Sequence, residues 1–127
     1  MSRKKSIDLT PAELRLMEVI WRKGKVTVGE VVEALAKTSN PAYNTVQTTM
    51  TILERKGYLH HTAAKAGRAF VYHPVVSHHQ ASGNAVRHLL GRFFGNSAEA
   101  LILNLIENDK LSHAELKRVR ELLKEPE

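Results

Sequence analysis

The sequence contains no cysteine among its 127 residues. This absence excludes disulfides, thiolate metal sites and cysteine nucleophiles, and it fits a reducing compartment. Long hydrophobic runs are also absent, so we expect no membrane-spanning segment. No apolar run follows residues 1–5, so we expect no signal peptide. These absences predict a cytoplasmic protein that does not insert into a membrane.

Signatures of catalysis are missing as well. The sequence has no glycine-rich phosphate loop, no nucleophile motif, no HExxH pattern and no clustered carboxylates. Ser77 and Ser82 stand near His78 and His79, but no orienting acid accompanies them, so we interpret both serines as helix-cap and surface residues. We therefore expect no enzyme and no cofactor.

Seven histidines raise the question of a metal site. His60 and His61 are neighbours in a predicted strand and would point to opposite faces. His78 and His79 would lie about 100° apart on a helix, which is a poor chelating geometry. We interpret these histidines as solvated or packing residues and predict no metal site.

Positive charge is abundant but unevenly distributed. The net charge is +6, and residues 1–76 hold 12 Lys/Arg against 6 Asp/Glu, whereas residues 77–127 hold seven of each. Such asymmetry favours a module for nucleic acid or another anionic surface joined to a neutral one. A basic surface that is merely solvated is the alternative. We expect two domains with the boundary between residues 76 and 77.

Three helices and a hairpin are predicted in the first domain. Capping boxes at Thr10–Glu13 and Thr27–Glu30 begin the first two helices, and Gly24 ends the first. Apolar residues recur at helical spacing in the first helix at Leu14, Met17, Ile20 and Trp21. A third helix covers residues 43–56. Two β-prone runs at residues 58–62 and 69–73 then flank a basic turn, which indicates a hairpin.

The third helix has two opposed faces. Val46, Met50 and Leu53 fall on one face with Tyr43, whereas the other carries amide, hydroxyl and guanidinium groups and no acid. Such groups suit base edges and phosphates, whereas a solvated face normally mixes Glu and Lys. The pattern therefore predicts a DNA-recognition helix, with double-stranded DNA as the partner. The predicted contacts of this helix and the hairpin are Asn44, Gln47, Thr48, Thr51, Arg55, Lys56, Lys65 and Arg68, with the arm Arg3-Lys4-Lys5.

The sequence of the second domain predicts short helices that carry a stripe of large apolar residues. About fifty residues cannot easily bury so many large apolar groups alone, so we expect a two-fold dimer. Packing of the stripe onto the first domain of the same chain is the alternative. The fold class is mainly α with a small β-hairpin wing, a winged helix-turn-helix followed by a helical dimerisation region. The expected dimer contacts are Val86, Leu89, Leu90, Phe93, Leu101, Leu105, Leu116, Val119 and Leu122.

Five segments in order resemble the penicillinase-repressor (BlaI/MecI) family. They are Leu9-Thr10-Pro11-Ala12-Glu13, Val19-Ile20-Trp21, Tyr43-Asn44-Thr45-Val46-Gln47-Thr48, Lys56-Gly57-Tyr58-Leu59 and Gly67-Arg68-Ala69-Phe70-Val71-Tyr72. The resemblance implies a cytoplasmic bacterial repressor that binds a palindromic operator as a homodimer through its C-terminal helices. It also implies that Asn44, Thr45, Gln47 and Thr48 form the DNA-facing start of the recognition helix, with Arg68 on the wing.

The resemblance further implies a route of inactivation. Family members are often cut in the C-terminal helices, after an asparagine followed by phenylalanine, in a process triggered by a membrane metalloprotease receptor that senses β-lactam. The corresponding pair here is Asn104-Leu105, where leucine replaces phenylalanine. We expect Asn104 to lie among buried residues; a plain helix-surface position is the alternative. A winged-helix module that binds protein instead of DNA is the alternative for the whole chain.

Overall fold

A computed structural model describes residues 8–63 and 69–124. The chain divides into two compact units, Met1–Ala85 and Val86–Glu127. The division falls later than the expected boundary at residues 76 and 77, because Val76 and Ala81 pack against the core of the first unit. The functional division at that boundary stays a prediction.

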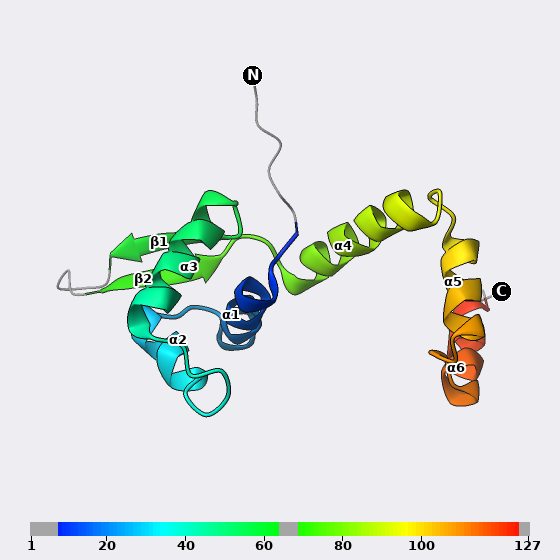
Figure 1. Cartoon of the computed structure of the whole chain (residues 1–127), viewed down its shortest axis with the longest axis horizontal. Coiled ribbons are helices and arrows are strands. Elements are labelled where there is room, and N and C mark those ends of the chain that lie inside the picture. The colour runs from blue at the N-terminus through cyan, green and yellow to red at the C-terminus, as the bar shows by residue number, and fades with distance from the viewer. Residues whose placement is uncertain (1–7, 64–68, 125–127) are drawn as a thin grey trace, which may run out of the picture. The chain divides into compact units, whose positions relative to one another are not determined.

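The first unit consists of three helices followed by an antiparallel hairpin (Figure 1). In the described residues its elements are α1 (Pro11–Lys23), α2 (Val28–Ala34), α3 (Tyr43–Arg55), β1 (Leu59–Ala63) and β2 (Phe70–Pro74). The strands pair with Leu59 opposite Pro74 and Ala63 opposite Phe70. The predicted order of helices and hairpin is confirmed, and each strand lies one residue further along the chain than expected.

The predicted capping boxes are present. The Thr10 hydroxyl accepts from the Glu13 amide at 3.1 Å, while the Glu13 carboxylate accepts from the Thr10 amide at 2.9 Å. The same reciprocal pair joins Thr27 and Glu30 at the start of α2. Because these bonds satisfy amides that the helix itself leaves unpaired, both helices begin where the sequence predicts.

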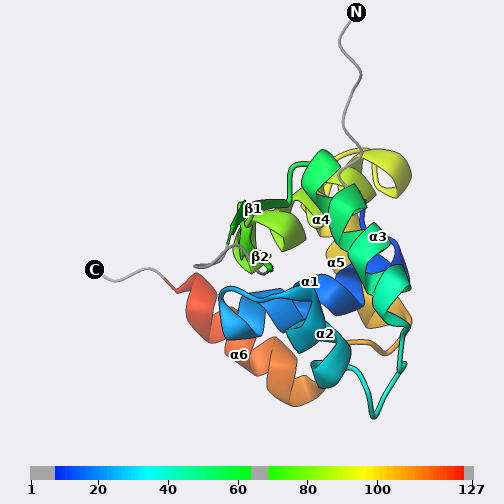
Figure 2. The same cartoon turned by 90° about the vertical axis from the view of Figure 1, so that its left-hand side faces the viewer.

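The core lies where α1, α2, α3 and the hairpin meet (Figures 1 and 2). Val46, Met50 and Leu53 are fully buried, so the predicted docking face of α3 is confirmed. Two members of the predicted apolar faces are largely exposed, Leu14 of α1 at 39% and Tyr43 of α3 at 52%. The buried residues of α1 are Glu13, Leu16, Met17, Val19 and Ile20, which include Met17 and Ile20 of the predicted apolar period.

The hairpin is tied to the helices at two points. Gly57 has a φ of 93°, which glycine adopts at little cost, and this residue turns the chain from α3 into β1. Val26, in the loop between α1 and α2, forms a β-bridge with Tyr72, with N–O distances of 3.0 and 2.7 Å. The hairpin is therefore held by main-chain bonds at its base.

The second unit begins within α4 (His78–Phe93) and continues with α5 (Ala98–Glu107) and α6 (His113–Leu123). Gly95 and Asn96 have positive φ and separate α4 from α5, as predicted. No residue of these three helices is buried. Among the expected dimer contacts, Leu90, Leu101, Leu105 and Leu116 are half-buried, and the exposed members are Val86, Leu89, Phe93, Val119 and Leu122.

None of the helices that the structure describes is long and apolar enough to cross a bilayer.

Candidate nucleic-acid interface

The polar face of α3 is exposed along its length. Asn44, Thr45, Gln47, Thr48, Thr51 and Arg55 are all exposed, whereas Val46, Met50 and Leu53 on the opposite face are buried. The helix is fixed by that buried face, so its polar side chains are presented on a rigid support. The structure thus brings together these six residues of the predicted recognition surface.

The first turn of α3 is suited to an anion. Ala42 occupies the N-cap and makes no side-chain hydrogen bond to the helix, and no acidic residue stands in the first turn. The N-terminal amides of a helix carry partial positive charge and attract phosphate. A phosphate approaching Asn44 or Thr45 would meet no repelling carboxylate within this turn.

Lys56 was expected to contact a phosphate, but in the structure its side chain is paired with Glu13. Its ammonium lies 2.7 Å from Glu13 Oε1 and 3.2 Å from the main-chain oxygen of Asp8. Burial would raise the pKa of Glu13, but hydrogen bonds from Lys56 and Thr10 outweigh it and lower the pKa. The stability from this carboxylate is therefore present at neutral pH and lost as the pH falls through the lowered pKa. Lys56 thus joins the end of α3 to the start of α1.

The wing residues Lys65 and Arg68 lie outside the described residues, as does the arm Arg3-Lys4-Lys5.

Three side chains, Glu54, His61 and Phe70, connect α3 to the hairpin, and we call this set the side-chain ladder. The sequence analysis did not predict it. Glu54 Oε1 lies 2.7 Å from His61 Nδ1, and the His61 ring stacks on Phe70 with centroids 4.3 Å apart. His60 points to the other face and stacks on His73 at 5.0 Å, as strand alternation predicts. The ladder links the recognition helix to both strands of the wing. Its one indication in the sequence was Glu54, an acidic residue near the border of a polar face of α3 that otherwise carries no acid.

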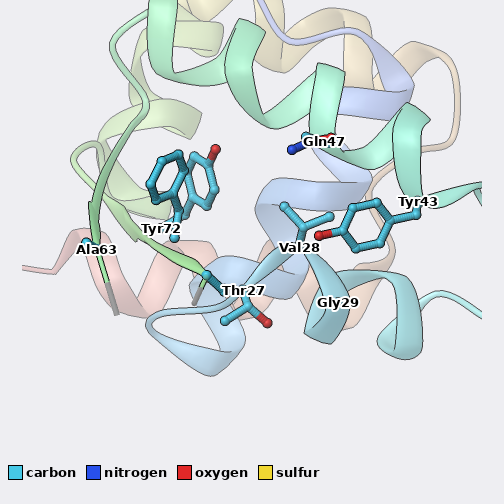
Figure 3. A pocket seen from close by; sticks show the side chains of 9 residues that line it. Thr27, Val28, Gly29, Tyr43, Gln47, Ala63 and Tyr72 are labelled. Atoms are coloured by element: carbon cyan, nitrogen blue, oxygen red, sulfur yellow. The ribbon is translucent and has the colours of Figure 1, made fainter. Parts of the chain in front are cut away.

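A groove of about 480 Å³ lies between the first turns of α3, the start of α2 and the end of the hairpin near Ala63 and Phe70 (Figure 3). Tyr43 and Gln47 extend toward it from α3, and Tyr72 lies on the hairpin side. The start of α2 and the exposed ring of Phe70 complete the lining. Burial raises the pKa of Tyr72, as does the Glu54 carboxylate, while a hydrogen bond with Thr51 opposes the rise. Gln47 therefore stands at the rim of the groove, between the polar face and the wing.

Threonine hydroxyls along α3 bond to the helix itself. Thr49 Oγ1 donates to the Thr45 oxygen at 2.8 Å, and Thr51 Oγ1 donates to the Gln47 oxygen at 3.1 Å. Such back-bonding uses the hydroxyl proton. The Thr51 hydroxyl is engaged by the Gln47 oxygen and by Tyr72, so a contact of this residue with a base would be made by its methyl group.

The described residues contain no group of three or more histidines and acids placed to hold a metal ion. Ser77 and Gln80 form a reciprocal capping pair at 2.9 and 3.0 Å, so the structure makes Ser77 the cap of α4.

Asn104 is exposed on α5, and its main-chain oxygen accepts from the amide and side chain of Asn108 at 3.1 and 2.9 Å. The expectation that it lies among buried residues is wrong, because α5 has no buried residue. Leu105 beside it is half-buried.

Three helices followed by an antiparallel hairpin, with an exposed polar face on the third helix, define a winged helix-turn-helix DNA-binding domain. The penicillinase repressor family model matches residues 9–125. The chain belongs to this family and is a transcriptional repressor.

Known relatives agree with this assignment. The penicillinase repressor of Bacillus licheniformis is 35% identical over 122 residues, which cover 96% of this chain and 94% of the relative. The methicillin resistance regulatory protein MecI of Staphylococcus aureus is 23% identical over 119 residues, covering 94% and 95%. The solution structure of the DNA-binding domain of the repressor BlaI matches with a TM-score of 0.50 and 39% identity, covering 59% of this chain and 90% of that domain. The resemblance and the winged-helix fold predicted from the sequence are confirmed.

Proposed function

We propose that this repressor acts in the cytoplasm, binds a palindromic operator as a homodimer, and controls β-lactam resistance or a related stress response. The observation that carries the proposal is the arrangement of α3. Its amide, hydroxyl and guanidinium groups are exposed on one face, and Val46, Met50 and Leu53 are buried on the opposite face. Its family is one of repressors, so the chain has a binding function and no catalytic one.

The α3 side chains divide into two kinds of contact. Asn44, Gln47, Thr48 and Thr51 face base edges in the major groove, and Arg55 and the first-turn amides near Thr45 bind phosphates. The wing residues Lys65 and Arg68 add phosphate contacts. Lys56 acts indirectly, because its bond to Glu13 orients the end of α3.

The C-terminal helices supply the dimer contact. Large apolar side chains remain exposed on all three, among them Phe93 at 68% and Leu122 at 74%. Single apolar residues on a surface are ordinary, but a contiguous set favours association. Two subunits would then present their α3 helices to half-sites roughly 34–36 Å apart or a multiple of that.

Release from DNA by proteolysis at Asn104-Leu105 is part of the proposal, with a membrane metalloprotease receptor as the partner. The exposure of Asn104 supports access. Cleavage would first require α5 to unwind locally, because Asn104 accepts two hydrogen bonds from Asn108 within a helical turn. A receptor that requires phenylalanine after the asparagine would not act on this chain.

Gln47→Ala tests the recognition surface. On an operator selected from random duplexes, we expect the variant to lose on the order of 1–3 kcal/mol of binding free energy, because a base-edge contact is removed. Affinity for an unrelated duplex should stay unchanged. Fluorescence anisotropy at several salt concentrations measures both, and the salt slope reports the phosphate contacts.

The control is Gln80→Ala, which removes the other glutamine of the chain from α4 and should bind like the parent. Equal binding of operator by Gln47→Ala and the parent would remove Gln47 from base recognition. A parent protein that binds DNA weakly and without salt dependence would favour the protein-interaction alternative.

His61→Ala tests the ladder between α3 and the wing. Removing the ring breaks the bond to Glu54 and the stack on Phe70, so the wing loses its fixed position beside α3. We expect operator affinity to fall about 3- to 10-fold, in line with about 0.5–1.5 kcal/mol for a stacked aromatic pair. The matched control is His60→Ala on the opposite face, and equal losses from both variants would rule out a specific role for the ladder.

A further inference from the structure

A second cavity, of about 400 Å³, lies within the first unit between α1 and the first turns of α4. None of its lining residues belongs to α3. Leu14, Glu18 and Trp21 line it from successive turns of α1, and His78 and Ala81 are among the residues that line it from α4. Its volume falls in the range of small-molecule sites, about 300–1,000 Å³.

Aromatic rings form fixed walls of this cavity. The Trp21 indole donates its Nε1 hydrogen to the Val76 oxygen at 2.9 Å and meets His78 edge to face, with centroids 5.0 Å apart. Tyr58 is only 4% exposed and adds a second immobile ring. The indole is therefore held in place before any ligand arrives.

The charge lining the cavity is negative, against the sign of the whole protein. Asp8 and Glu18 contribute carboxylates, and no lysine or arginine is among the described residues that line it. Burial raises the pKa of Tyr58, and the carboxylates of Asp8 and Glu13 raise it further, so the Tyr58 hydroxyl lies in a negative potential. The nearby Lys56 ammonium is paired with Glu13. A cation is therefore favoured here although the chain carries a net charge of +6.

We propose that this cavity binds a small organic cation, a protonated amine or quaternary ammonium that carries an apolar group. The Trp21 ring offers a π face that attracts such a cation, and the Glu18 carboxylate complements its charge. Leu9 and Leu14 give the apolar group a surface to cover. The site requires no DNA, so it can be tested independently of repression.

The test uses Trp21, the only tryptophan of the chain, as the reporter. The full-length protein without DNA is titrated with 2-phenylethylammonium, 2-phenylethanol and phenylacetate, which share a ring and differ in charge. We expect the ammonium compound to change Trp21 fluorescence saturably, the alcohol to bind about tenfold more weakly, and the carboxylate not to bind. Isothermal titration calorimetry confirms the same order without relying on fluorescence.

Glu18→Gln keeps the shape of the side chain and should weaken binding of the ammonium compound several-fold. Glu33→Gln removes an exposed carboxylate from α2, outside the cavity, and should bind like the parent. Circular dichroism melting shows whether each variant folds. The proposal is overturned if amine and alcohol bind equally, if folded Glu18→Gln binds like the parent, or if nothing saturates at millimolar concentration. An affinity that falls as the protein is concentrated would mean that a second copy fills the cavity, and would overturn it as well.

Discussion

Leu53→Ala is expected to lower the free energy of unfolding of the first unit by about 2–5 kcal/mol. Leu53 is fully buried beside Val46 and Met50, where α3 packs on α1 and β1. The substitution removes apolar contacts and leaves a cavity that close-packed neighbours cannot fill completely. Urea unfolding followed by Trp21 fluorescence measures the loss, since Trp21 belongs to the same unit.

Leu14→Ala is the matched control for this measurement. It makes the same chemical change in the same unit, but at a side chain that is 39% exposed. Because much of that side chain already contacts water, we expect less than half of the loss seen for Leu53. Equal losses would mean that the buried face of α3 is not the main support of the unit.

Leu89→Glu is expected to convert the proposed dimer into monomers. Leu89 lies on α4 in the set of exposed apolar residues, and a carboxylate there would be buried without a partner on association, at high cost. Since a monomer reaches only one half-site at a time, operator affinity should fall about 10²- to 10⁴-fold. Sedimentation velocity gives the oligomeric state, and anisotropy with full and half operators gives the affinity.

Leu89→Met keeps the position apolar and should remain dimeric. A Leu89→Glu protein that still sediments as a dimer would place the interface on another surface. If the parent itself is monomeric at micromolar concentration, the exposed stripe has a different partner.

Local signals in the sequence predicted much of the fold. The capping boxes at Thr10 and Thr27 depend on residues three apart, so the pattern alone defines both helix starts. The division of α3 into a buried and a polar face follows from one helical period, and Met50 and Gln47 lie on the sides that the period assigns. These features need no knowledge of the rest of the chain.

Features that depend on distant residues could not be predicted in this way. Leu14 belongs to the apolar period of α1, yet it lines a cavity instead of the core, because burial is decided by what packs against each turn. Lys56 looked like a free cation, and only its placement beside Glu13, 43 residues earlier, shows that it is paired. His61 likewise gained its role from the approach of Glu54 and Phe70.

The bridge between Val26 and Tyr72 has a consequence for the order in which the protein assembles. It joins residues 46 positions apart, so it can close only after a long loop has been brought together. During synthesis the three helices leave the ribosome before β2 exists, and the recognition helix is thus made ahead of the wing that flanks it. We expect the wing to be the last part of the first unit to become protected from hydrogen exchange, and a chain stalled before Tyr72 to display α3 without its flanking sheet.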